Sequence, residues 1–210
     1  TAQRIDGGGR YVVPGFNDMH FHAIEAAERP TTFWPLMVSS GITGYREMSG
    51  SVALLERGRR VNRQIAEEGL IAPEVLVQTG RLLALTPEGP LPGITTAERA
   101  IQEVRRQKQL GADFVKIITV TRETFFATAG EAKAQGLPLV GHLTPVVSAT
   151  EASNAGMKAM EHLGGGLISV PLDCSTDEAA IRQQVLARAA APRPPAAPPT
   201  PAQIQRGLVN

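Results

Sequence analysis

The 210-residue sequence lacks the features that mark several classes of protein. Its single cysteine, Cys174, cannot form an internal disulfide, so nothing indicates an oxidised scaffold. No apolar run reaches the roughly 18 residues of a membrane span, and the first residues do not resemble a signal segment. Because the sequence starts at Thr1 rather than at methionine, the localisation stays open, with the cytoplasm slightly favoured.

Neither sign of charge is in excess. The 21 Lys and Arg residues and the 20 Asp and Glu residues leave a net charge of +1. Such a chain has no basic surplus to neutralise nucleic-acid phosphates or an anionic membrane surface. The phosphate-binding pattern Gly-x-x-x-x-Gly-Lys and the serine-nucleophile pattern Gly-x-Ser-x-Gly are both missing. We therefore expect neither nucleic acid nor membrane as partner, and a homo-oligomer stays open.

What the sequence does contain is 42% hydrophobic residues, enough for a buried core, in a regular order. Short apolar runs alternate with longer helical stretches about six times, which is typical of an α/β fold with parallel strands. Capping boxes predict helix starts at Thr95, Ser148 and Ser175, each with a glutamate three residues later. Strands are expected over residues 16–22, 42–47, 75–79, 113–118, 138–142 and 157–162.

The four histidines of the chain all fall at the ends of expected strands. His20 and His22 are two residues apart, so on a strand they would project from one face, together with Asp18. His142 and His162 end two later strands. Because the carboxyl ends of strands in a parallel barrel converge on one mouth, the joint pattern favours a metal site. One such histidine alone would more often be a surface or hydrogen-bonded residue.

Lys116 is unusual because it lies in an otherwise apolar strand, Gly111 to Ile118. An edge strand, or a side chain that carries its ammonium to water, would explain it simply. Beside divalent cations, however, a lysine has to be neutral. A neutral amine can add carbon dioxide and become a carbamate, an anionic ligand that can bridge two metals. Both interpretations stay open at this point.

A resemblance to a known family rests first on the segment Pro14-Gly15-Phe16-Asn17-Asp18-Met19-His20-Phe21-His22. This segment resembles the first-strand signature of the amidohydrolase superfamily. The order His-x-His, Lys, His, His along the chain resembles the binuclear-metal branch of that superfamily. The chain is similar to imidazolonepropionase-like and prolidase-like members of this branch in three further segments, Ser40 to Glu47, Gly111 to Ile118 and Glu161 to Gly164.

The resemblance implies a TIM (β/α)8-type barrel, of which about six strand-helix units are present. It also implies that His20 and His22 hold one divalent metal ion and that His142 and His162 hold a second. Carbamylated Lys116 would bridge the two ions, which would be zinc, with manganese, iron or cobalt as alternatives. Asp18 would support the histidines by accepting an imidazole N–H, and a hydrogen bond at the strand start is an equal alternative.

The sequence departs from the family pattern in two respects. The family's eighth strand supplies an aspartate that serves as general base, and this sequence holds no counterpart to it. The β-sandwich that flanks the family's barrel is reduced to a remnant in residues 1–12, followed by a partial barrel over residues 13–190. The Pro- and Ala-rich residues 191–210 are expected to form a loop or linker. We therefore expect an incomplete portion of an enzyme.

Three hypotheses on function follow. The first is an amidohydrolase with a small-molecule substrate. It would use a metal-activated hydroxide to cleave carbon–nitrogen bonds in amides, lactams, imides or non-standard peptides, or to cleave esters. The second is a metal-binding fragment or pseudoenzyme without turnover, because the aspartate is missing. The third is a structural α/β domain with fortuitous histidines, and it predicts no stoichiometric metal.

Overall fold

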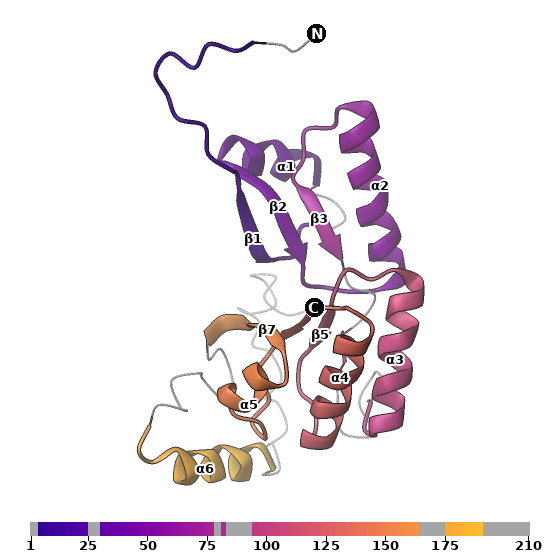
Figure 1. Cartoon of the computed structure of the whole chain (residues 1–210), viewed down its shortest axis with the longest axis vertical. Helices are drawn as coiled ribbons and strands as arrows, with labels where there is room; N and C mark the ends of the chain where they lie inside the picture. Colours follow the sequence, from indigo (N-terminus) through magenta and orange to yellow (C-terminus); the bar gives the residue numbers. More distant parts are fainter. Residues whose placement is uncertain (1–3, 25–29, 78–80, 83–93, 164–174, 191–210) are drawn as a thin grey trace, which may run out of the picture.

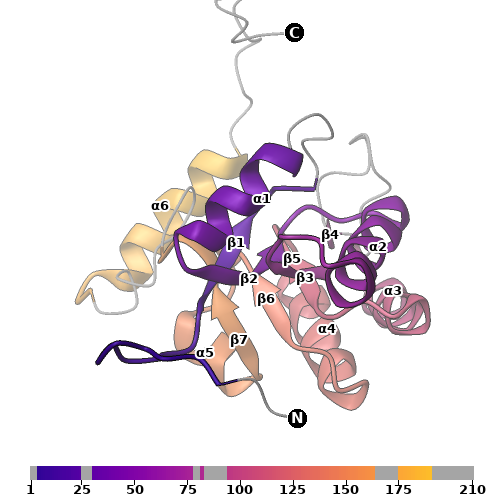
Figure 2. The ribbon, with the colours of Figure 1, turned by 90° about the horizontal axis from the view of Figure 1, so that it is seen from above.

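The computed structural model describes residues 4–24, 30–77, 81–82, 94–163 and 175–190. Within these residues, short parallel strands alternate with helices along the chain. Seen from above, the strands occupy the middle and the helices lie around them (Figure 2). The predicted parallel α/β fold is confirmed.

The described strands form two sheets (Figure 1). Every strand pair in both sheets is parallel, and the order of strands in each sheet follows the order along the chain, as successive β-α-β units produce. The first sheet contains β1 (Phe16–Phe21), β2 (Ile42–Glu47) and β3 (Glu74–Val77). The second sheet contains β4 (Arg81–Leu82), β5 (Val115–Ile117), β6 (Leu139–Gly141) and β7 (Met157–Met160).

Asp113 marks the place where the two sheets meet. Its carboxylate accepts a hydrogen bond from the Val77 N–H at 2.8 Å, and its own N–H donates to the Val77 carbonyl at 3.0 Å. The Asp113 side chain thus accepts the hydrogen bond that a backbone carbonyl of a neighbouring strand would accept at the end of β3. The predicted strand over residues 75–79 is found as far as Val77, and residues 78–80 lie outside the described residues. The described strands therefore do not form the one continuous sheet that the barrel prediction implies.

Six α-helices and one short 3₁₀ helix are present in the described residues. Ser148 starts α5 with both hydrogen bonds of a capping box to Glu151, as predicted. The prediction for Thr95 is wrong by one residue, because Thr96 caps α3 and accepts from the Arg99 N–H. Ser175 accepts from the Asp177 N–H ahead of α6. The helices are α1 (Pro30–Ser39), α2 (Val52–Glu68), α3 (Ala97–Leu110), α4 (Arg122–Ala134), α5 (Ala149–Asn154), α6 (Glu178–Ala190) and η1 (Glu161–Leu163).

Two apolar cores lie between the sheets and their helices. The first joins Trp34 of α1, Leu55 of α2 and Val75 of β3, all buried. The second joins Phe125 of α4 with Leu139 of β6, among others. Burial of these faces is the main favourable contribution to the fold, because it removes apolar surface from water.

A third cluster lies on the inner face of both sheets. Met48 follows β2, Phe114 precedes β5 and Val140 lies in β6, and all three side chains are buried together. Ala159 of β7 packs against them. Since residues in a strand alternate between faces, Val140 turns away from the outer core that holds Leu139. The two sheets thus share one interior, which is consistent with part of a TIM-like barrel.

The N-terminal residues lie apart from this body. Residues 4–15 contain no helix or strand, and Tyr11 and Val12 are 95% and 98% exposed. The trace leads away from β1 (Figure 1). Residues 4–12, predicted as a β-sandwich remnant, thus show no strand, and the predicted linker over 191–210 lies outside the described residues. None of the described helices is both long enough and apolar enough to cross a membrane.

Candidate functional site

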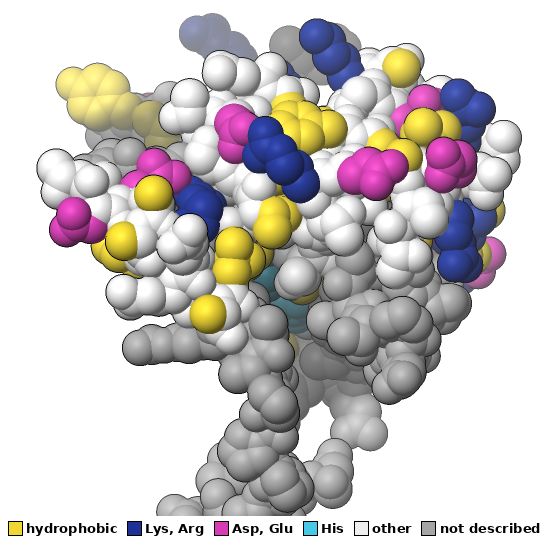
Figure 3. Space-filling model, turned by 90° about the horizontal axis from the view of Figure 1, so that it is seen from below, with side chains coloured by type: hydrophobic (Ala, Val, Ile, Leu, Met, Phe, Trp, Pro, Cys, Tyr) yellow, Lys and Arg dark blue, Asp and Glu magenta, His cyan; other side chains and the backbone are white. Residues whose placement is uncertain are grey.

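The four imidazole rings lie side by side at the carboxyl ends of strands from both sheets. His20 is in β1 and His22 follows it, while His142 follows β6 and His162 lies in η1 after β7. Ring centroids are 5.3 Å apart for His22 and His20, 4.4 Å for His20 and His162, and 5.2 Å for His162 and His142. Figure 3 shows histidine side chains at the bottom of a recess on the face seen from below. Side chains separated by up to 142 positions thus form one row.

His20 is held by the carboxylate of Glu161, which lies in η1 after the last strand of the second sheet. Its Nδ1 lies 2.8 Å from Glu161 Oε2. The other oxygen of this carboxylate accepts from Arg46 Nη2 at 2.9 Å, and Arg46 Nε donates to the Met19 carbonyl at 2.8 Å. An anionic carboxylate can only accept a hydrogen bond, so this contact favours the His20 tautomer with the proton on Nδ1 and the lone pair on Nε2.

His22 is held by a second group of buried polar atoms. Its Nδ1 lies 2.8 Å from Ser49 Oγ and 3.6 Å from Glu47 Oε1. Glu47 is fully buried and accepts hydrogen bonds from the backbone N–H groups of Ile24 and Ser49. Both histidines of the His-x-His pair therefore contact a polar partner through Nδ1, which is the arrangement common behind metal-binding imidazoles.

Lys116 is buried inside the molecule. Its side chain is 2% exposed, and its Nζ donates to the Met48 carbonyl at 3.0 Å. In the sheet, Lys116 pairs with Arg81 of β4 on one side and Val140 of β6 on the other. Neither an edge strand nor a side chain that reaches water explains this lysine.

His142 differs from an ordinary surface histidine. Burial lowers its pKa, and the charges of Lys116, His162 and His20 lower it further, whereas Glu161 acts in the opposite direction. The neutral form of the imidazole is therefore favoured. A neutral imidazole is the form that binds a metal ion.

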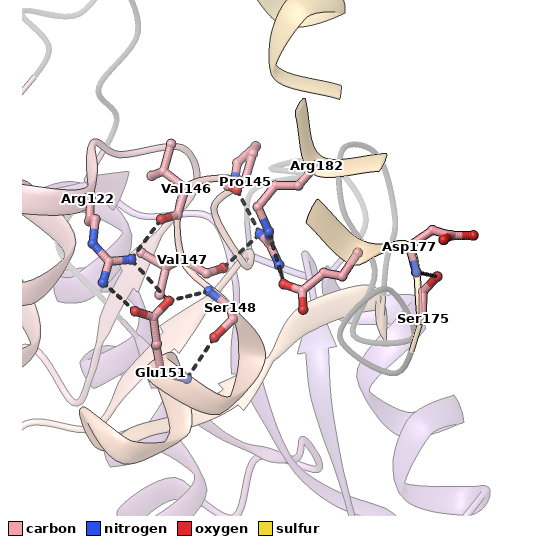
Figure 4. Close-up of polar contacts among 10 residues, drawn as sticks. Arg122, Pro145, Val146, Val147, Ser148, Glu151, Ser175, Asp177 and Arg182 are labelled. Carbon is pink, nitrogen blue, oxygen red and sulfur yellow. Dashed lines mark hydrogen bonds and ion pairs between the residues drawn. The ribbon is translucent and has the colours of Figure 1, made fainter. Parts of the chain in front are cut away.

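The loop that follows His142 is fixed by two arginines (Figure 4). Arg122 of α4 donates to the Val146 carbonyl at 3.1 Å and binds the Glu151 carboxylate. Arg182 of α6 donates to the Pro145 carbonyl at 2.8 Å and to Glu178 at 2.6 Å. Side chains from α4, α5 and α6 thus hold the backbone directly after His142 in place.

Asp18 lies two residues before His20 in β1. The register of β1 against β2 shifts between Asp18 and Phe21, where four residues of β1 lie opposite three of β2, Tyr45 to Glu47. Asp18 and His20 are half-buried and Met19 between them is exposed, as alternation along a strand predicts. Asp18 Oδ1 accepts the His20 backbone N–H at 3.0 Å. This contact is the hydrogen bond expected as the alternative, and support of an imidazole by Asp18 stays a prediction.

Four residues around the site carry polar contacts that the sequence reasoning did not assign: Arg46, Glu47, Ser49 and Glu161. A signal for them was present, since Arg46 and Glu47 end an expected strand and Glu161 adjoins His162. Charged residues at such positions have to find partners when they are buried.

The chemistry of these side chains fits divalent cations. Four imidazoles, with polar groups at Nδ1 of two of them, are a donor set that zinc and related ions bind. Within the described part of the chain, no group of three or more His, Cys, Asp or Glu side chains has an arrangement that could hold a metal ion. The fit to divalent cations therefore rests on the residue types and on their place at the strand ends, and not on the spacing of the side chains in this structure.

Comparison with known proteins gives a likeness of fold. No protein-family model and no curated protein matches the sequence. Among the solved structures that are similar, three share 18% identity with this chain. They are an Xaa-Pro dipeptidase with methionine bound in its active site (TM-score 0.56, 82% of this chain and 51% of that chain), an uncharacterized protein (0.55, 82% and 51%) and a protein from Bifidobacterium longum provisionally named a prolidase (0.51, 83% and 54%). The chain thus spans about half the length of each structure and shares the fold of that half.

Proposed function

We propose that this chain carries the metal-binding part of a hydrolase that cleaves carbon–nitrogen bonds. The observation that carries the proposal is the row of four imidazoles beside a buried lysine at the carboxyl ends of parallel strands. Active sites of parallel α/β barrels are built at these ends. The fold likeness to an Xaa-Pro dipeptidase supports the same class of reaction.

Each side chain has a role in this proposal. His20 and His22 would hold one divalent cation, and His142 and His162 would hold the other. Lys116 would become a carbamate: its neutral Nζ forms a bond to the carbon of carbon dioxide and loses one proton, which leaves an anionic group able to contact both cations. Zinc is the first choice, and manganese, iron or cobalt are alternatives.

Bound divalent cations would supply an activated water and would polarise the scissile carbonyl. The protein residues hold the donors in place for this chemistry. Glu161 and Ser49 fix the rings of His20 and His22 through Nδ1. Burial lowers the pKa of His142, which favours the neutral ring that can donate a lone pair. The arginines of α4 and α6 hold the loop after His142.

The substrate proposed is a small amide, lactam, imide or non-standard peptide, with esters as an alternative class. The name of one similar structure, an Xaa-Pro dipeptidase, makes dipeptides with a C-terminal proline the first substrates to test. A metal-binding chain without turnover is the second candidate. It follows from the expected general-base aspartate that the sequence does not supply.

The test is hydrolysis of Xaa-Pro dipeptides and N-acyl amino acids by the zinc-loaded 210-residue chain, with and without a chelator. We expect slow hydrolysis that the chelator stops and that His142→Ala and Lys116→Ala abolish. The matched control Glu123→Gln changes an exposed residue of α4 and should leave the rate unchanged. Hydrolysis that survives the chelator would contradict the proposal. Zinc binding without any turnover would favour the second candidate.

A carbamate on Lys116 can be tested separately. We expect a carbonyl signal in the carbon-13 spectrum when the zinc-loaded protein is incubated with labelled bicarbonate. Lys116→Ala should remove the signal, and Lys108→Ala, in the last turn of α3, should not. The same signal in the Lys116→Ala protein would exclude this lysine as the modified group.

A further inference from the structure

Glu161 connects three separate parts of the molecule. Its two oxygens bind His20 of β1 and Arg46 of β2, although Glu161 itself follows β7 of the other sheet. The side chains of Arg46 and Glu161 are 8% and 7% exposed, so this contact is almost entirely out of water. A buried carboxylate with two cationic or N–H partners has little freedom to turn.

The residue that follows Glu161 has an unusual backbone. His162 has φ 65° and ψ 3°, and among the described residues it is the one non-glycine residue with a positive φ. Such a conformation is unfavourable for a residue with a side chain. It persists only where neighbouring contacts enforce it. Here the conformation places the His162 ring 4.4 Å from the His20 ring.

The two features are adjacent in the chain. Glu161 is bound to side chains of β1 and β2, and the left-handed turn follows at the very next residue. One carboxylate thus contacts His20 directly and adjoins His162 in the backbone.

We propose that Glu161 is a positioning residue of the candidate site: it keeps the proton of His20 on Nδ1 and holds His162 against the His20 ring. The alternative is that Glu161 only ties the two sheets together through Arg46. The proposal rests on the proposed function where it concerns metal binding. The proton position of His20 can be measured without any metal.

The chemistry of Glu161→Gln distinguishes the two roles. Arg46 has only donors, so the oxygen of a glutamine would face Arg46 and its NH₂ group would face His20 Nδ1. Nδ1 would then have to accept a hydrogen bond, and the proton would move to Nε2. We expect the substitution to reverse the tautomer of His20, whereas a purely structural tie would leave the tautomer unchanged.

The first experiment is nitrogen-15 NMR of the histidine rings in the metal-free 210-residue protein, at a pH where the imidazoles are neutral. A chain with four histidines gives only four sets of ring signals. We expect His20 protonated on Nδ1 in the wild type and on Nε2 in Glu161→Gln. A wild-type His20 that is protonated on Nε2 overturns the proposal even if the variant does not fold.

The second experiment is a zinc titration in competition with a chromophoric chelator. We expect Glu161→Gln to weaken zinc binding about 10–100-fold, as loss of a partner behind a metal-binding imidazole does. The matched control is Glu131→Gln, which removes the ion pair between Glu131 of α4 and Arg105 of α3, a pair that involves no histidine, and should bind zinc like the wild type. Equal zinc affinity in Glu161→Gln and the wild type overturns the proposal. A reversed tautomer in a protein that never binds zinc supports the role of Glu161 and refutes the proposed function alone.

Discussion

Substitution of Gly141, the last residue of β6, tests how tightly the strands that carry the site are packed. Gly141 has φ 129°, and a Cβ atom built there lies 2.1 Å from the Ile117 carbonyl oxygen and 2.7 Å from the Ile117 nitrogen. These are backbone atoms of β5, and the same oxygen accepts the His142 N–H at 2.9 Å. A side chain at Gly141 therefore has to displace the strand pairing next to His142.

The cost of Gly141→Ala has two parts. The backbone conformation is one that residues other than glycine rarely adopt, at about 1–3 kcal/mol. The steric overlap with β5 adds about 1–3 kcal/mol, as overpacking does elsewhere. The sum, about 2–6 kcal/mol, is a large part of the 5–15 kcal/mol by which domains of ordinary size are stable.

Gly130→Ala provides the matched control. Gly130 lies inside α4, is exposed, and has no atom within 4 Å of a built Cβ. We expect this substitution to raise the free energy of unfolding by about 0.5–1 kcal/mol, because alanine favours the helix. Urea unfolding followed by circular dichroism measures the free energy of unfolding of both proteins. The two values are compared with the same slope of this free energy against urea concentration. A Gly141→Ala protein within about 1 kcal/mol of the wild type would refute the reasoning.

Two further predictions concern ion pairs. The hydrogen bond from Arg122 and, to a smaller extent, the one from the Ser148 N–H lower the pKa of Glu151 from 4.5 to about 2. The stability from this carboxylate is complete above pH 4.5 and is lost as the pH falls toward 2, so the stability difference between wild type and Glu151→Gln should shrink between pH 5 and pH 3 in urea titrations. A constant difference would contradict the assignment. Arg46→Met leaves the buried Glu161 carboxylate without its guanidinium and should cost about 3–5 kcal/mol. The double variant Arg46→Met/Glu161→Gln should cost less than the sum of the two single variants, and strict additivity would show that the pair is not coupled.

Features that depend on residues close together in the sequence could be predicted well. The six expected strands and the place of all four histidines at strand ends were readable because strand periodicity and helix caps are local properties. Ser148 shows this directly, since its capping box involves residues three apart. The shift from Thr95 to Thr96 at α3 shows the limit, because both residues offer the same hydroxyl.

Features that depend on distant residues were harder to predict. The register shift in β1 between Asp18 and Phe21 is one such feature, since a period of two does not indicate a bulge. The partners of His20 and Lys116 come from residues 141 and 68 positions away. A charged residue in an expected strand is one local signal of such a contact: Lys116 carries it, and so do Arg46 and Glu47.

The most direct test of the central claim is the zinc content of the 210-residue chain after equilibrium dialysis. Two zinc ions per chain are expected in the wild type, with a clear loss in His20→Ala and in His142→Ala and no change in the exposed control Glu123→Gln. Absence of bound zinc in the folded wild-type protein, or a zinc content that neither histidine substitution alters, would contradict the claim that these imidazoles form a metal centre.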